Sequence, residues 1–256
     1  MSERRHDAIR AYYQTLFSKW GRQHWWPARS RFEVIVGAYL TQNTAWTNVE
    51  KALGELRKAR VLTIAGIRRT PRVELEHMIR SAGYFRQKAQ RLKTFVRFLD
   101  ERYSRSLARM FARPTAELRE ELLALNGVGP ETADSILLYA GNHPVFVVDA
   151  YTRRILERHG MVSSAAGYEE IRLLFEQALS GTPLPRQSSD EPPAPKAGPR
   201  GSSHPPSAVS EASRSPGVQR FNEMHGLIVG VGKNYCLKSQ PQCEQCPLQK
   251  FLPPAK

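Results

Sequence analysis

The sequence predicts an all-α fold, and three observations support that prediction. Apolar residues recur at intervals of three and four along most of the chain, which is the spacing of the buried face of an amphipathic helix. Strand patterns are almost absent, since the apolar run at 145–148 (VFVV) is too short and isolated to build a sheet. At 256 residues the chain is also long enough to bury a substantial core, as one large domain or two small ones.

The predicted helices follow one another along the sequence. Four segments keep the helical spacing of apolar residues: 32–42, 48–59, 86–103 and 115–125. The turn at 126–129 (NGVG) precedes a further helix that begins at Pro130, because proline is favoured in the first turn of a helix. The last helical pattern covers 218–236 and runs into a group of cysteines.

One segment does not fit this pattern. Residues 181–217 hold nine of the eighteen prolines and eight serines, a composition that buries too little apolar surface to offset the entropy lost on ordering. We therefore expect a disordered insertion at 181–217. The flanking segments, 1–180 and 218–256, are expected to form one fold together.

The charge of the chain favours a polyanionic partner. Lys and Arg together number 38 against 24 Asp and Glu, which gives a formal net charge of +14. The insertion contains four basic and three acidic residues, so nearly all of the surplus belongs to the folded part. Such a surplus raises the local concentration of polyanions, and nucleic acid is the leading candidate. A basic but otherwise ordinary enzyme is the alternative.

The compartment is expected to be the cytoplasm, with the chromosomal DNA. The N-terminal residues have no apolar core of signal-peptide length, and no apolar run is long enough to span a membrane. The three cysteines all lie between 236 and 246, so they do not form a disulfide framework. Their clustering indicates a metal or iron–sulfur site.

The glycine turn and a later aspartate are the candidate functional features. The backbone amides of Gly127, Val128 and Gly129, with Thr132 in the first turn of the next helix, suit a phosphate oxygen. An ordinary corner between two packed helices is the alternative. The apolar run at 145–148 ends at Asp149, which is compatible with an N-cap, with a catalytic carboxylate at the mouth of a cleft, or with both.

Residues 125–155 (LNGVGPETADSILLYAGNHPVFVVDAYTRRI) resemble the helix-hairpin-helix DNA glycosylases of the endonuclease III superfamily. The resemblance extends from about residue 24 to 246 and is interrupted by the insertion. It implies a two-lobed helical fold, with the helix-hairpin-helix at about 115–141 and a DNA cleft between the lobes. It also implies a monomer that binds double-stranded DNA with a damaged base. A monovalent cation at the hairpin is expected, and a nucleotide cofactor is not.

By this resemblance, Asp149 activates water or stabilises the oxocarbenium-like sugar while the N-glycosidic bond breaks. Bifunctional members of the superfamily carry a lysine in the second hairpin helix that attacks the sugar as a Schiff-base nucleophile. Glu131 stands at the matching position here. Because a carboxylate cannot form an imine, a monofunctional glycosylase without lyase activity is expected. The alternative is that a lysine elsewhere in the chain takes the role of the nucleophile.

The base pocket is expected in residues 23–53, which resemble the 3-methyladenine DNA glycosylase III group in their Trp-Trp-Pro segment and an aromatic after LTQNT. The resemblance implies that Trp25, Trp26, Pro27 and Trp46 wall the pocket and that Gln42 fills the gap left by the flipped base. A methylated purine is positively charged, and a cation over an indole face gains about 0.5–2 kcal/mol. The alternative substrates are uracil or thymine in a mismatch, or an oxidised pyrimidine.

The cysteines stand at 236, 243 and 246, in a loop at 236–252. The family's cluster pattern continues with a fourth cysteine at the position that Leu252 occupies here. A [4Fe–4S] cluster normally takes four thiolates, so a retained cluster, a lost cluster with a vestigial loop, and an altered C-terminus all stay open. Lys238 lies beside this loop and is a candidate DNA contact, while His225 is expected to be a packing residue.

Two other classes of protein compete with an enzyme. A helix-hairpin-helix module that only binds DNA has no use for a carboxylate facing a polyanion, so Asp149 argues against it. An iron–sulfur electron-transfer or sensor protein has little need for the Trp-Trp-Pro segment, and the missing fourth cysteine also argues against it.

Overall fold

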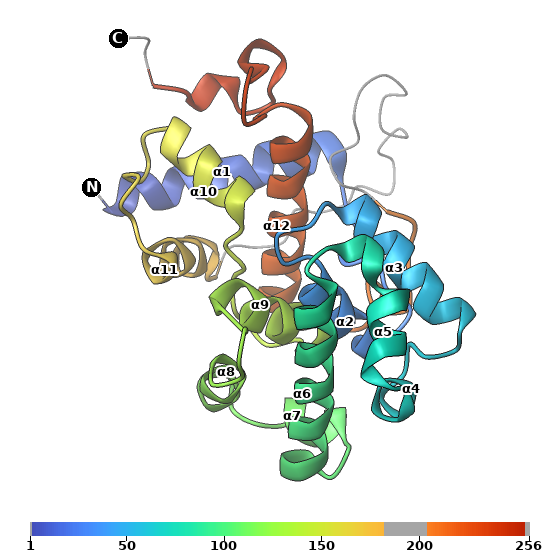
Figure 1. Cartoon of the computed structure of the whole chain (residues 1–256). Coiled ribbons are helices and arrows are strands. Elements are labelled where there is room, and N and C mark those ends of the chain that lie inside the picture. Colours follow the sequence, from blue (N-terminus) through green and yellow to red (C-terminus); the bar gives the residue numbers. More distant parts are fainter. Residues whose placement is uncertain (1, 182–203, 254–256) are drawn as a thin grey trace. The chain divides into compact units, whose positions relative to one another are not determined.

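A computed structural model describes residues 2–181 and 204–253, and every regular element in these ranges is a helix (Figure 1). The all-α prediction is confirmed. The chain divides into two compact units. Unit 1 consists of Met1–Pro27 and Pro144–Lys256, and unit 2 consists of Ala28–His143. Within the described ranges, no helix is both long and apolar enough to cross a lipid bilayer.

Unit 1 is built around one long helix near the C-terminus. Its helices are α1 (Ser2–Trp20), α10 (Ala150–Arg158), α11 (Tyr168–Leu179), α12 (Pro216–Asn234) and two short 3-10 turns, η3 (Cys243–Gln245) and η4 (Gln249–Phe251). Helices α1, α10 and α11 all pack on α12, which is buried along most of its length (Figure 1). Phe146 stacks on Phe175 at a centroid distance of 4.2 Å and meets Phe221 edge-on. The extended run at 145–148 is thereby fixed against α11 and α12.

Unit 2 is built around α6. Its elements are α2 (Arg31–Leu40), α3 (Trp46–Lys58), α4 (Ile64–Arg69), α5 (Arg72–Met78), η1 (Arg80–Ala82), α6 (Phe85–Tyr103), α7 (Leu107–Phe111), α8 (Thr115–Leu123), α9 (Pro130–Ser135) and the π-helical continuation η2 (Ile136–Gly141). Helices α2, α4 and α5 pack on the apolar face of α6. This face forms because the buried side chains of α6 recur every three or four residues. Helix α2 is buried almost throughout and also packs on η2.

The predicted insertion is only partly described. Residues 182–203 lie outside the described residues, whereas 204–217 are described and fold onto unit 1. The amide of His204 donates to the carbonyl of Gln23, Val209 is buried, and the imidazole of His24 lies 2.7 Å from a carboxylate oxygen of Glu211. The prediction of disorder is therefore wrong for 204–217. Local composition could not reveal these contacts, because their partners lie about 180 residues earlier in the chain.

Lys88, on α6, is fully buried and joins three parts of unit 2. Its ammonium group donates to the carbonyl oxygens of Leu40 and Ala82 and to the hydroxyl of Thr44, at 2.6–2.9 Å. Lys88→Met should lower the free energy of unfolding by about 1–3 kcal/mol, because buried acceptors lose a donor. Urea unfolding measures this, with Lys51→Met at an exposed position of α3 as the control. Equal losses in the two variants would contradict the role given to Lys88.

Candidate active site

Asp149 is the N-cap of α10. Asp149 follows the buried run at 145–148, and its backbone is extended. The Oδ1 atom of Asp149 accepts hydrogen bonds from the amide of Thr152 at 2.7 Å and from the hydroxyl of Thr152 at 2.8 Å. The side chain keeps 13% of its surface exposed. The capping prediction is confirmed. Because Thr152 holds only Oδ1, the carboxylate is fixed in orientation while Oδ2 faces other partners.

His225 lies next to the Asp149 carboxylate. It is buried on α12, and its Nε2 lies 3.6 Å from Oδ2 of Asp149. The rings of Trp25 and Phe146 flank it, each at a centroid distance of 6.2 Å. Burial lowers the pKa of His225, which the charge of Asp149 only partly opposes, so the imidazole is neutral at neutral pH. Local sequence patterns do not predict this pairing, since 76 residues separate the two positions.

The Trp-Trp-Pro segment also belongs to unit 1. Trp25 and Trp26 are 6% and 5% exposed, and their rings meet edge-on at a centroid distance of 5.5 Å. Pro27 is half-buried. A side chain at Gly226 would crowd Trp25 and Gln23, so this glycine lets the segment lie close against α12. Through His225, the structure brings Trp25 to the same part of unit 1 as Asp149.

The glycine hairpin joins α8 to α9 in unit 2. Gly127 has φ +79°, a left-handed conformation that favours glycine, and both Gly127 and Gly129 are exposed. Val128 differs from the expectation. Its amide donates to the carbonyl of Leu125, and the residue is buried, so this amide is already engaged within the turn. The candidate anion-binding amides are therefore those of Gly127 and Gly129.

Gln42 is placed directly against the hairpin. Its Nε2 donates to the carbonyl of Gly127 at 3.0 Å and to the hydroxyl of buried Thr132 at 2.9 Å, and its Oε1 accepts from Arg91. The Arg91 guanidinium lies so close to Gly127 that a Cβ there would overlap it. Arg91 is thus a basic group over the exposed turn. Sequence reasoning missed it, because only the fold brings the first half of α6 to the hairpin.

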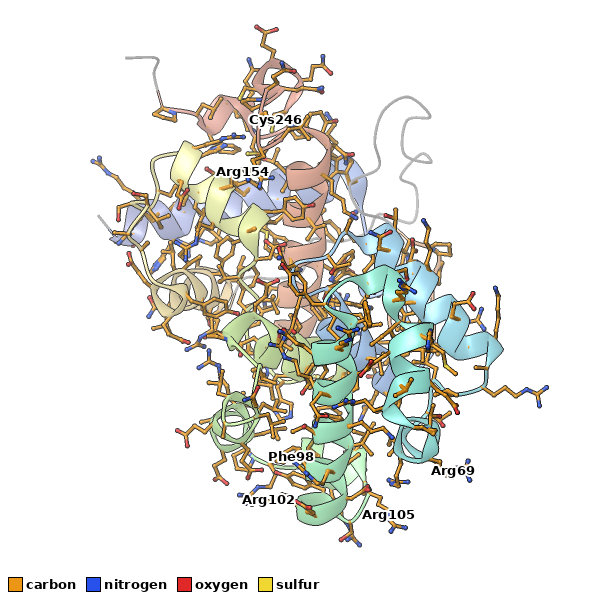
Figure 2. The ribbon with its side chains drawn as sticks, in the orientation of Figure 1. Arg69, Phe98, Arg102, Arg105, Arg154 and Cys246 are labelled. Carbon is orange, nitrogen blue, oxygen red and sulfur yellow. The ribbon has the colours of Figure 1, made fainter. Side chains whose placement is uncertain are left out.

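The other predicted positions of unit 2 are more exposed. Glu131 is exposed in the first turn of α9, and Trp46 is half-buried as the first residue of α3. In addition, Arg102 lies in the last turn of α6 and Arg105 follows the helix, and Figure 2 labels both. Unit 2 therefore contributes basic side chains beyond the hairpin to the net charge.

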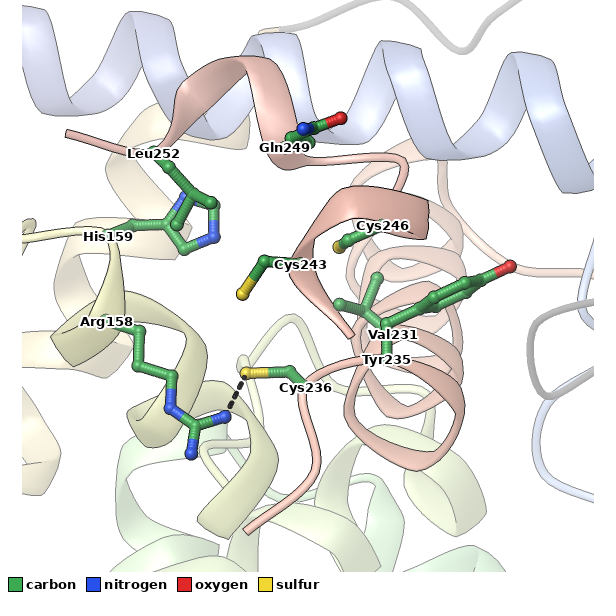
Figure 3. Close-up of a pocket in the computed structure, with 9 residues that line it drawn as sticks. All are labelled: Arg158, His159, Val231, Tyr235, Cys236, Cys243, Cys246, Gln249 and Leu252. Atoms are coloured by element: carbon green, nitrogen blue, oxygen red, sulfur yellow. Dashed lines mark hydrogen bonds between the residues drawn. The ribbon is translucent and has the colours of Figure 1, made fainter. Parts of the chain in front are cut away.

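The three cysteines line one pocket in unit 1, together with His159 and Leu252 (Figure 3). In the ranges that the structure describes, no three Cys, His, Asp or Glu side chains are placed to hold a single metal ion. Arg158 donates to the Cys236 sulfur at 3.2 Å and to the carbonyl of exposed Lys238 at 3.0 Å. Arg154 donates to the Cys236 carbonyl at 2.7 Å, and Figure 2 shows it on the same side of unit 1 as Cys246.

The chain is similar to known proteins in both sequence and fold. Residues 36–180 match the family described as HhH-GPD superfamily base excision DNA repair protein. A protein of Methanocaldococcus jannaschii, named as a candidate DNA repair glycosylase, is 38% identical over 253 residues that cover 98% of each chain. The crystal structure of an H. pylori 3-methyladenine DNA glycosylase bound to 1,N6-ethenoadenine has a TM-score of 0.69 and 27% identity, covering 90% of this chain and 97% of that one. A trapped covalent complex of endonuclease III with DNA shares the fold, with a TM-score of 0.70, 21% identity and coverage of 96% and 94%.

Proposed function

Because the chain belongs to the HhH-GPD superfamily of base excision DNA repair proteins, and so is a DNA glycosylase, we propose that it releases alkylated bases without cleaving the strand. We further propose Asp149 as its catalytic residue. One observation carries the proposal. In unit 1 the fixed, partly exposed carboxylate of Asp149 lies beside His225, which the indole of Trp25 flanks.

The carboxylate suits hydrolysis of an N-glycosidic bond. As the bond from the base to the sugar C1′ breaks, the base leaves with the bonding electrons and positive charge develops on the sugar. The anionic Asp149 stabilises that charge and accepts a proton from the water that adds to C1′. Its Oδ1 is held by Thr152, so the carboxylate has little need to reorganise during the reaction.

The indoles favour an alkylated purine over a neutral lesion. A base such as 3-methyladenine carries positive charge, which an aromatic face attracts, and it leaves as a neutral molecule without an acid to protonate it. Trp25, Trp26 and Pro27 are proposed as base-contacting residues, with Trp46 of unit 2 as a further stacking residue. The similar H. pylori enzyme is named for 3-methyladenine and was crystallised with 1,N6-ethenoadenine, which agrees with this substrate class.

The absence of lyase activity is proposed from Glu131. A Schiff base with C1′ requires an amine, and the first turn of α9 offers a carboxylate at the position where bifunctional relatives carry the lysine. The exposed turn at Gly127 and Gly129, with a bound monovalent cation, is proposed to hold a DNA phosphate, and Lys238 is proposed as another phosphate contact.

The function is tested by base release from methylated duplex DNA. We expect chromatography to show free 3-methyladenine, and gels to show strand breaks only after alkali treatment. Duplexes with uracil, a thymine mismatch or an oxidised pyrimidine serve as parallel substrates. Release from those duplexes alone would refute the alkylated-base assignment, and breaks before alkali would refute the assignment of Glu131.

Arg91 is predicted to contact a phosphate of bound DNA. Arg91→Ala should weaken DNA binding and reduce the slope of log affinity against log salt by about 1, because one fewer counterion is released. Fluorescence anisotropy across a salt series measures both quantities. Arg97→Ala removes the same charge from an exposed position two turns further along α6 and serves as the control. An unchanged slope in Arg91→Ala would contradict the phosphate contact.

A further inference from the structure

The cysteine pocket of unit 1 contains a fourth potential ligand. Cys236, Cys243 and Cys246 turn their sulfur atoms into the pocket, which His159 and Leu252 also line (Figure 3). Thiolates and imidazoles are both donors to iron in proteins, whereas Leu252 has no donor atom. The pocket therefore holds three sulfur donors and one nitrogen donor, although the cysteine pattern alone is one ligand short.

The arrangement fits a cluster better than a single ion. In the described part of the chain, no three Cys, His, Asp or Glu side chains are close enough together to bind one metal ion. A structural zinc site requires that closeness, because its ligands share one ion. A [4Fe–4S] cluster does not require it, because each protein ligand binds a different iron. The four donors line one pocket, as the ligands of a single cluster must.

The imidazole of His159 is held in place by neighbours on two other segments. Its Nδ1 lies 2.7 Å from the hydroxyl of Tyr12, on α1. The ring also lies close to the backbone of Phe251, the residue before Leu252. Histidines that bind metals are commonly oriented by a hydrogen bond at the nitrogen that does not bind. The bond to Tyr12 keeps the imidazole next to the chain position where a fourth cysteine would stand.

Basic side chains next to Cys236 suit an anionic cluster. Arg158 donates to the Cys236 sulfur at 3.2 Å, and Arg154 donates to its carbonyl oxygen at 2.7 Å. Hydrogen bonds to the sulfur ligands tune the cluster. The pocket thus provides both the ligands and the charge compensation.

We propose that this chain binds a [4Fe–4S] cluster through Cys236, Cys243, Cys246 and His159, with the imidazole as the ligand of the fourth iron. When bound, the cluster would tie the end of α10 to the loop after α12. The competing role for His159 is purely structural, namely to anchor Tyr12 of α1. The proposal does not depend on which base the enzyme releases.

The first test uses the unsubstituted chain. Reconstitution in the absence of air with sulfide and equal amounts of ferrous and ferric iron should yield about four irons per chain and a visible charge-transfer absorption. Pulsed EPR of the reduced protein should show strong coupling to a nitrogen nucleus. Labelling of histidine alone with 15N should change that coupling, which assigns the nitrogen without any substitution.

Substitutions then identify the histidine and test its replacement. His159→Ala should lose the nitrogen coupling and release one iron on brief exposure to air, leaving a three-iron cluster. His159→Ala combined with Leu252→Cys should retain four irons and show no nitrogen coupling. Circular dichroism and thermal melting establish that each variant is folded before its cluster is examined.

Three results would overturn the proposal. One is an unsubstituted chain that takes up no cluster on reconstitution. Another is a cluster in the unsubstituted chain that shows no histidine coupling and loses one iron as readily as the cluster of His159→Ala. The fourth iron would then have no protein ligand. The last is a nitrogen coupling that persists in His159→Ala.

Discussion

Asp149→Asn should reduce base release by about 100- to 10,000-fold while leaving the protein folded. Asparagine is as good an N-cap as aspartate, so the start of α10 and the hydrogen bonds from Thr152 are expected to survive. The substitution removes only the negative charge and the basicity of the carboxylate. Single-turnover release of 3-methyladenine from methylated duplex DNA measures the effect on the chemical step.

Asp149→Ala is the companion variant, because it removes the cap as well as the charge. It should lose the same activity and in addition about 1 kcal/mol of stability. DNA affinity separates an enzyme from a binding module. Asp149→Asn should bind DNA at least as tightly as the unsubstituted chain, since a carboxylate facing a polyanion is gone. Activity of Asp149→Asn within tenfold of the unsubstituted chain would remove Asp149 from the mechanism.

Asp134→Ala should lower the free energy of unfolding by about 3–5 kcal/mol. The Asp134 side chain is fully buried in α9, and Arg119 on α8 donates to its two oxygens at 2.7 and 3.2 Å. This pair joins the two helices that flank the hairpin turn. Loss of the carboxylate takes both of its hydrogen bonds from a largely buried guanidinium, which is the costly way to break an ion pair. Urea unfolding monitored by circular dichroism measures the change.

Glu117→Ala provides the matched control on α8. Glu117 pairs with Arg113 on the surface, and its side chain is 52% exposed. Removal of that exposed pair should change the stability by about 0–1 kcal/mol. A similar small loss in Asp134→Ala would mean that the buried pair does not hold the hairpin helices together. A large loss accompanied by weaker DNA binding would show that the pair also positions the turn.

The sequence predicted those features that depend on neighbouring residues. The segment predicted as a helix at 86–103 is observed as Phe85–Tyr103, because its apolar spacing alone defines the buried face. Asp149 as an N-cap follows equally from a local pattern, an extended apolar run that stops at an acid before a helical segment.

Features that depend on distant residues were missed. His225 next to Asp149, Arg91 over Gly127 and the packing of 204–217 all require the tertiary fold. The turn amides were misjudged for a different reason. Sequence reasoning treated all three as free, whereas a tight turn uses the amide of Val128 for its own closure to Leu125.

The two units are formed from different parts of the sequence, and this determines the order in which they can fold during synthesis. Unit 2 is one continuous segment, Ala28–His143, whereas unit 1 combines the first 27 residues with everything from Pro144 onward. Chains generally fold as they leave the ribosome, one compact unit at a time. The hairpin can therefore form midway through synthesis. The surroundings of Asp149 are complete only after α12 has been synthesised, because His225 lies on that helix. On the proposed function, the turn that holds a DNA phosphate would thus be complete before the site that removes the base.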